Sequence, residues 1–158
     1  MSMKKTSLLV ASHALVLGVG VALGIYLLPI LAAPPAPSDA EVKSASAGAT
    51  FRGEFKRSLP GSDALHWGEG TVAVGPEAVS LMGRVAPGPA YKLYLVPEFV
   101  DTPEAFKRVK AQSKVVGDVK TFENFIVPLP AGTDLGHYKA VVIWCESFSQ
   151  FITAAQYR

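Results

Sequence analysis

Residues 138–148 read Tyr138-Lys139-Ala140-Val141-Val142-Ile143-Trp144-Cys145-Glu146-Ser147-Phe148, and a second apolar run, 150–157, follows at once. Apolar side chains occupy both odd and even positions from Ala140 to Trp144, so a strand through them would bury both of its faces. This pattern predicts an interior strand of a sheet. Its last residue, Cys145, is the only cysteine of the chain and shares a face with Val141 and Ile143.

The N-terminal segment, residues 1–33, differs in composition from the rest of the chain. No Asp, Glu, Lys or Arg lies between Leu8 and Ala33. As a helix, the 21 residues from Leu8 to Leu28 would be about 31 Å long, which matches the hydrocarbon core of a bilayer. We therefore expect residues 1–33 to form a short cytoplasmic tip followed by a single transmembrane helix.

A cleaved signal peptide is the alternative for this segment. Its apolar core would be about 7–15 residues long and would end at a small-residue cleavage site. The run here is longer, and Ala33 is followed by Pro34 and Pro35, which disfavour binding as an extended protease substrate. An uncleaved anchor fits better. Because Lys4 and Lys5 precede the span, we expect the N-terminus inside and, in a bacterium, a periplasmic domain held at the inner membrane.

Charge and cysteine content limit the classes of function. The chain has 15 Lys and Arg against 13 Asp and Glu; without Lys4 and Lys5 the balance is 13 against 13. A neutral domain does not favour a nucleic-acid partner, which would select a basic one. With one cysteine the chain has no internal disulfide, so its core must hold the fold. An exposed thiol would be a liability outside the cytoplasm, which predicts a buried or partnered Cys145.

The rest of the chain divides into a linker and one domain. Residues 34–48 are rich in Pro, Ala and Ser and predict a tether without a packed element. Residues 49–158 show short strand patterns separated by Gly and Pro, and one helix signal at Thr102-Pro103-Glu104, where a cap precedes proline and an acid. We predict a mainly β domain, an antiparallel β-sandwich or partly closed barrel of short strands with one short helix, after a single transmembrane helix.

Four segments carry a resemblance to a known family: Gly53-Glu54-Phe55, His66-Trp67-Gly68-Glu69-Gly70, Tyr91-Lys92-Leu93-Tyr94-Leu95, and Tyr138 with Val141-Val142-Ile143-Trp144-Cys145-Glu146-Ser147-Phe148. Residues 49–158 thereby resemble the DM-thirteen domain. The resemblance implies an all-β extracellular or periplasmic module with an electron-transfer role centred on Cys145. Trp144, Glu146 and Phe148 are the family motif around that cysteine.

The residues themselves describe Cys145 differently. Apolar neighbours and the adjacent carboxylate of Glu146 both disfavour a thiolate, so the local sequence predicts a poor nucleophile. Two hypotheses follow. In the first, the domain is a redox or electron-transfer module that uses Cys145; in the second, it is a non-catalytic protein-binding or scaffold module with Cys145 buried in its core. A thiol that pairs between two chains is a third.

No cofactor is assigned from the sequence. His66, His137 and Met82 are ligand types that copper uses, but residues 146–158 contain neither His nor Met, whereas blue-copper sites draw ligands from the loop after the cysteine. Covalent c-type haem is excluded because the chain has no Cys-x-x-Cys-His. No metal site is predicted.

The sequence carries no recognised catalytic motif, and its indications of partners lie in the predicted span. The sequence has no nucleophile elbow, phosphate loop or zinc spacing, so no enzyme is predicted. Gly20 and Gly24 form a small-x-x-x-small pair on the predicted span, which would let two copies self-associate, and the anchor favours a protein partner in the same membrane.

Overall fold

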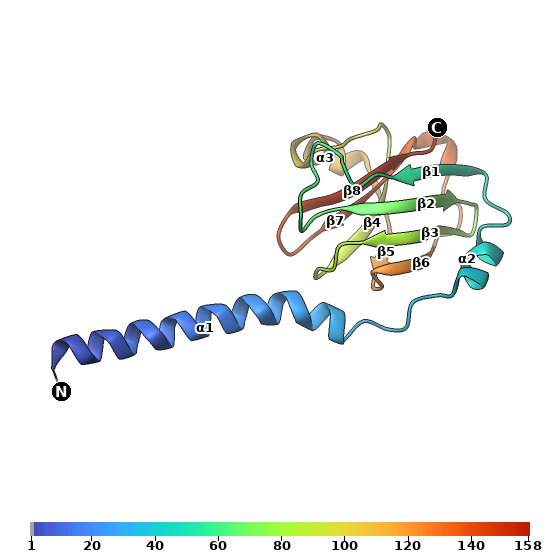
Figure 1. Ribbon diagram of the computed structural model, residues 1–158. Helices are drawn as coiled ribbons and strands as arrows, with labels where there is room; N and C mark the ends of the chain where they lie inside the picture. The colour runs from blue at the N-terminus through green and yellow to red at the C-terminus, as the bar shows by residue number, and fades with distance from the viewer. Residues whose placement is uncertain (1) are drawn as a thin grey trace.

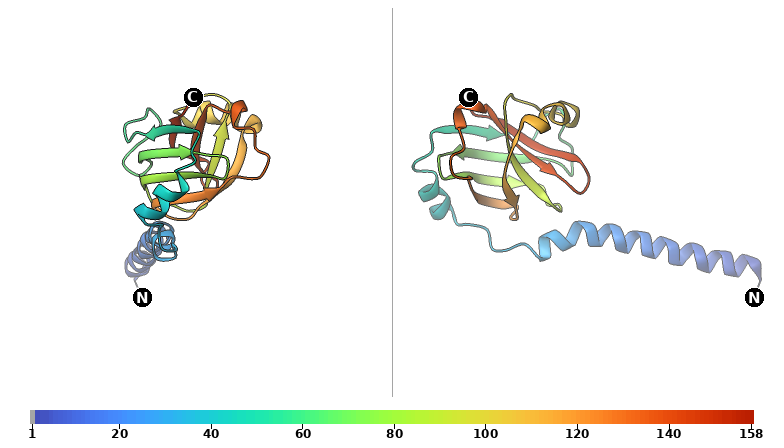
Figure 2. Two further views of the ribbon diagram at one scale, coloured as in Figure 1. Left: turned by 90° about the vertical axis from the view of Figure 1, so that its right-hand side faces the viewer. Right: turned by 180° about the vertical axis from the view of Figure 1, so that it is seen from behind.

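The computed structural model describes residues 2–158, and its most extended element is helix α1 (Met3–Leu31). This helix is 29 residues long, and none of its side chains is buried. It projects from one side of a β-rich body (Figures 1 and 2). The predicted long apolar helix is confirmed, and α1 is long and apolar enough to cross a membrane.

Two four-stranded antiparallel sheets form the body. The first has the order β1-β2-β3-β6: β1 (Phe51–Phe55), β2 (Gly68–Val74), β3 (Ala78–Val85) and β6 (Glu123–Pro128). The second has the order β5-β4-β7-β8: β5 (Lys114–Val119), β4 (Tyr91–Val96), β7 (Ala140–Cys145) and β8 (Gln150–Gln156). Of the two predicted arrangements, the sandwich is correct, since the described residues form two separate sheets and no closed barrel.

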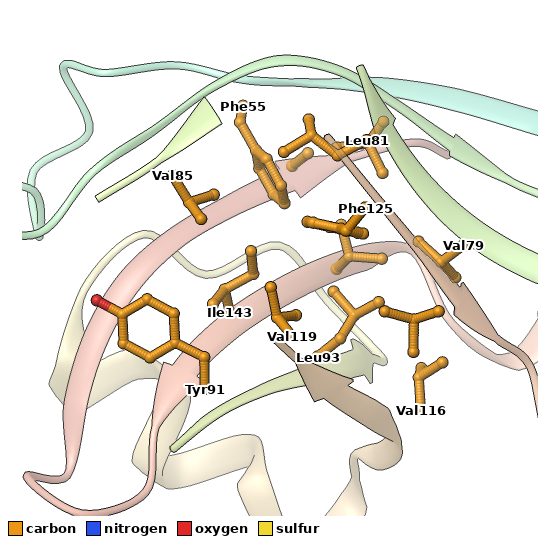
Figure 3. Packing of buried hydrophobic residues seen from close by; sticks show 14 of the residues in the cluster. Phe55, Val79, Leu81, Val85, Tyr91, Leu93, Val116, Val119, Phe125 and Ile143 are labelled. Atoms are coloured by element: carbon orange, nitrogen blue, oxygen red, sulfur yellow. The ribbon is translucent and has the colours of Figure 1, made fainter. Parts of the chain in front are cut away.

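Strand β7 is an interior strand, as predicted, because it pairs with β4 on one side and β8 on the other. All six of its residues are buried. Val141, Ile143 and Cys145 face the core between the sheets, where Ile143 lies opposite Leu81 and Phe125 of the other sheet (Figure 3). The alternate residues of β7 belong to a second apolar cluster, under helix α3 (Pro103–Val109). Each face of β7 therefore has its own cover.

Helix α3 begins and packs as its sequence predicts. The Thr102 hydroxyl accepts a hydrogen bond from the Ala105 N–H at 3.2 Å, and Pro103 occupies the first turn. Phe106 and Val109, three positions apart, are buried on the sheet. Two single-turn 3₁₀ helices complete the body, η1 (Lys110–Gln112) and η2 (Leu135–His137).

The expectation that residues 34–48 hold no packed element is wrong. They contain helix α2 (Asp39–Ala45), which starts with a capping box between Ser38 and Glu41. Val42 is only 2% exposed, and α2 lies beside β3 and β6. One valine among small residues shows no helical periodicity, so the sequence did not indicate a packed helix. A single apolar side chain can nevertheless dock a short helix when a preformed sheet is there to bury it.

Candidate functional site

Cys145 is the last residue of β7 and lies where the two sheets come close to the loop between β3 and β4. It is 2% exposed, which confirms the predicted burial. Its Sγ donates a hydrogen bond to the carbonyl oxygen of Pro89 at 3.1 Å. The thiol is therefore held in one direction by a partner from the connection that joins the two sheets between β3 and β4.

A small pocket of about 130 Å³ reaches this thiol. Its walls are mostly apolar. They come from three connections (β1–β2, β3–β4 and β7–β8), from strands β4, β7 and β8, and from the C-terminal part of α1: Ile25, Tyr26, Leu65, His66, Pro87, Gly88, Pro89, Tyr91, Cys145, Phe148, Gln150 and Ile152. The volume accommodates a few water molecules or a small reactant. Of the family motif residues around Cys145, only Phe148 lies in this pocket.

The electrostatics of the pocket keep Cys145 protonated. Burial raises the pKa of the Cys145 thiol, the backbone N–H groups of Phe148 and Ser147 act in the opposite direction, and the charge of Glu146 adds a smaller increase. The predicted disfavouring of the thiolate is thus correct, but its main cause is burial rather than Glu146. The same two N–H groups can donate hydrogen bonds to the thiolate once the sulfur has lost its proton.

Tyr91 is the cross-strand partner of Cys145 on β4. Its side chain is buried in the same core cluster, and burial raises the pKa of its phenol well above the usual value. The ring lies against Gly88, where a Cβ atom would come within 2.7 Å of Tyr91 Cζ. Glycine at position 88 is therefore required for the tyrosine to form this wall of the pocket.

His66 also lines the pocket, and its orientation is fixed by Asp63. The His66 Nδ1 lies 2.8 and 2.9 Å from the two oxygens of Asp63, and the backbone N–H groups of Leu65 and His66 donate to the same carboxylate. The hydrogen bond from His66 lowers the pKa of Asp63 below its usual value. Because a carboxylate only accepts, Nδ1 carries the proton in this contact. The pocket thus places an oriented imidazole and a buried thiol in the same lining.

Trp144 and Glu146 lie on the opposite face of the sheet from this pocket. The Glu146 carboxylate accepts hydrogen bonds from Lys110 Nζ at 2.8 Å and from the Tyr94 hydroxyl. Burial alone would raise the pKa of Glu146, but these hydrogen bonds lower it below its usual value. Lys110 Nζ also lies 5.4 Å from the centre of the Trp144 ring, which packs on Phe106. These contacts fasten α3 to the end of β7.

Comparison with known proteins agrees with the motifs. A family model described as "Electron transfer DM13" matches residues 55–157, most of the β body. The chain belongs to the DM13 family. No curated protein and no solved structure matches it. The DM13 description supports a redox-related role, and the resemblance found in the sequence is confirmed at the level of the family.

The three residues of types that bind copper, His66, His137 and Met82, do not lie together in this DM13 domain. His66 lines the pocket of Cys145, whereas Met82 and His137 are not among its lining residues. His137 belongs to η2, which precedes β7 at the end of the strand opposite Cys145. Within residues 2–158 there is no group of three or more His, Cys, Asp or Glu residues that could hold a metal ion.

Sequence reasoning did not find three of the residues that surround Cys145 in the DM13 domain. Asp63 was missed although the spacing Asp63-x-x-His66 is typical of a local side-chain turn and was a usable signal. Tyr91 belongs to a segment that carries the family resemblance, but nothing in that segment indicates that it lies beside Cys145. Pro89 carries no sequence signal for its role, because it meets Cys145 from 56 positions away.

Proposed function

We propose that this DM13 protein is a membrane-anchored redox module in which Cys145 is the group that is oxidised and reduced. The observation that carries the proposal is the pocket itself: a buried thiol and a histidine line one small space, and two backbone N–H groups are directed at the sulfur. The family description, electron transfer, supports the same chemistry. In this proposal α1 is an uncleaved anchor, and the β body lies on the periplasmic or other extracytoplasmic side.

The proposed half-reactions balance with the residues present. His66 accepts the thiol proton, and the N–H groups of Ser147 and Phe148 stabilise the resulting thiolate. A peroxide then oxidises the sulfur: an S–O bond forms, the O–O bond breaks, and the departing oxygen leaves as water after taking the proton. Two electrons and two protons from a reductant return the sulfenic acid to the thiol and release a second water. An internal disulfide is excluded because Cys145 is the only cysteine.

Hydrogen peroxide serves as the probe oxidant to test this proposal on the full-length protein in detergent or lipid discs. Wild type is expected to gain the mass of one oxygen at a single site, to be trapped by a 1,3-dione and to return to the thiol with dithiothreitol. Cys145→Ser keeps a donor for the Pro89 carbonyl, so it should unfold cooperatively and gain no oxygen. His66→Gln should slow the reaction at least several-fold, whereas Gln150→Asn on the same pocket rim should not.

One specific observation favours a second candidate, a non-catalytic protein-binding or scaffold module. Cys145 is only 2% exposed and its S–H group already has a partner, as in a purely structural cysteine. If peroxide modifies Cys145 only after unfolding, and Cys145→Ser changes stability alone, the scaffold function replaces the redox function. A cysteine that stayed unreactive in the native wild-type protein would be decisive.

The placement of the body has a separate test. Ala131→Cys in a Cys145→Ser background, at an exposed position of the connection between β6 and β7, would be expressed in bacteria and treated with a membrane-impermeant maleimide. Labelling in intact spheroplasts is expected if the body is outside. Labelling only after lysis would place it in the cytoplasm, and recovery of the chain without residues 1–33 would show that the anchor is cleaved.

A further inference from the structure

We infer that the rim of the Cys145 pocket rests on the surface of the same lipid bilayer that α1 enters. This inference uses the anchorage proposed above, but it does not depend on any redox chemistry of the thiol. It concerns the side from which the pocket is reached. Three independent features carry it: the length of the connection, the position of the end of α1 and the side chains on the rim.

The connection between helix and body is short and fixed at both ends. Helix α1 ends at Leu31, and its last backbone bond runs from the Ala32 N–H to the Leu28 carbonyl. The next fixed point is Pro37, whose carbonyl oxygen accepts a hydrogen bond from Asn124 of β6 at 3.1 Å. Only residues 33–36 lie between Ala32 and Pro37, two of them proline. At about 3.1 Å per residue, the five steps from Ala32 to Pro37 reach no more than about 16 Å, so the body cannot move far from the end of the anchor.

The end of α1 lies against the pocket. Ile25 and Tyr26 are part of the pocket wall, beside Phe148 and the loop that carries Pro89. In Figure 1 the β7–β8 hairpin reaches back over the C-terminal part of α1, while the chain joins the body at its far side through α2. In a span that ends at Leu28, Tyr26 lies at the level of the headgroups, where tyrosine is enriched. The mouth of the pocket is therefore at the same depth.

The rim carries exposed apolar side chains, which are favourable at a membrane surface. Leu65 is 62% exposed and Phe148 is 57% exposed, and both line the pocket. Burial of these two side chains at the interface removes apolar surface from water, which favours the docked position. The adjacent groove, lined by Leu28 and Pro29 of α1, also contains Lys92 and Lys120 against one acidic residue, Asp118. One excess positive charge there favours anionic headgroups.

The test uses the full chain in vesicles of phosphatidylcholine and phosphatidylglycerol that contain a nitroxide-labelled phospholipid. Phe148→Trp places a fluorophore on the rim. The matched control is Phe99→Trp. Phe99 is 38% exposed and lies after Val96, at the end of β4 away from Tyr91 and the pocket. The spectrum of the wild-type protein, which contains Trp67 and Trp144, is subtracted from the spectrum of each variant. Leu65→Trp is a second rim variant.

The emission of the tryptophan added at position 148 or 65 is expected to be blue-shifted. The nitroxide lipid should quench it at least threefold more strongly than it quenches the tryptophan of Phe99→Trp. A nitroxide at the headgroup should quench it more than a nitroxide near the bilayer centre. Equal quenching at positions 148, 65 and 99 would overturn the docking. Retention of the protein after alkaline carbonate extraction reports the anchor separately. Retained protein without rim quenching refutes only the docking, whereas protein lost from the vesicles refutes the anchorage and the docking together.

Discussion

Asn124 joins the connection to the body, so changing it should release α2 without unfolding the sandwich. Its Oδ1 accepts from the Gly83 N–H at 3.0 Å, where β3 and β6 shift register. Its Nδ2 donates to the Pro37 carbonyl at 3.1 Å and to an Asp39 carboxylate oxygen at 2.9 Å. Asn124→Asp keeps the acceptor for Gly83 and removes both donors. It also places a carboxylate beside that of Asp39.

The expected size of the effect follows from the two lost hydrogen bonds. Each contributes about 1 kcal/mol net, so the free energy of opening α2 should fall by about 2 kcal/mol. Because 1.4 kcal/mol is a factor of ten, this corresponds to a roughly 30-fold larger equilibrium constant for opening. Burial of Val42 is unchanged by the substitution and should keep α2 partly docked.

Native-state hydrogen exchange on the full-length protein measures this directly. The amides of Val42 and Ser46, bonded to the carbonyls of Ser38 and Val42, should exchange roughly 30-fold faster, by the same arithmetic, in Asn124→Asp. Amides of β7 should not change. Adding Asp39→Asn to Asn124→Asp supplies an amide donor for the new carboxylate and should recover part of the protection. Unchanged exchange in α2, or an equal increase in α2 and β7, would refute the reasoning.

Two further predictions concern the surroundings of Cys145. Lys110→Met removes the cation that holds the Glu146 carboxylate at 2.8 Å and should lower stability by about 1 kcal/mol at pH 7. Because the folded-state pKa of Glu146 is lowered, its contribution is fully present above the usual value of 4.5 and is lost as pH falls through the lower folded-state pKa, so the stability difference in denaturant titrations should disappear in acid. Gly88→Ala forces the ring of Tyr91 to move and should cost about 1–3 kcal/mol, whereas Gly48→Ala, with nothing near its Cβ, should be neutral in thermal unfolding. An unchanged midpoint for Gly88→Ala, or a difference for Lys110→Met that persists in acid, would contradict these contacts.

The local patterns of this sequence determined several elements. The unbroken apolar run from Ala140 to Trp144 specified an interior strand, because a strand covered on only one side would alternate with polar residues. The cap at Thr102 and Pro103 specified the start of α3, and the charge-free run after Leu8 specified α1. Each of these signals is contained within one element and needs no partner to be read.

Only the tertiary structure decided the surroundings of the thiol. Cys145 meets Pro89 from 56 positions away, and Asn124 meets Pro37 from 87 positions away. Pro89 and Pro37 lie in connections rather than in strands, so these contacts depend on how the connections are placed against the sheets. The sequence thus determined that Cys145 would be buried on a central strand. Which side chains meet it was decided by how two sheets and their loops close around that strand, since no local pattern encodes contacts across a sandwich.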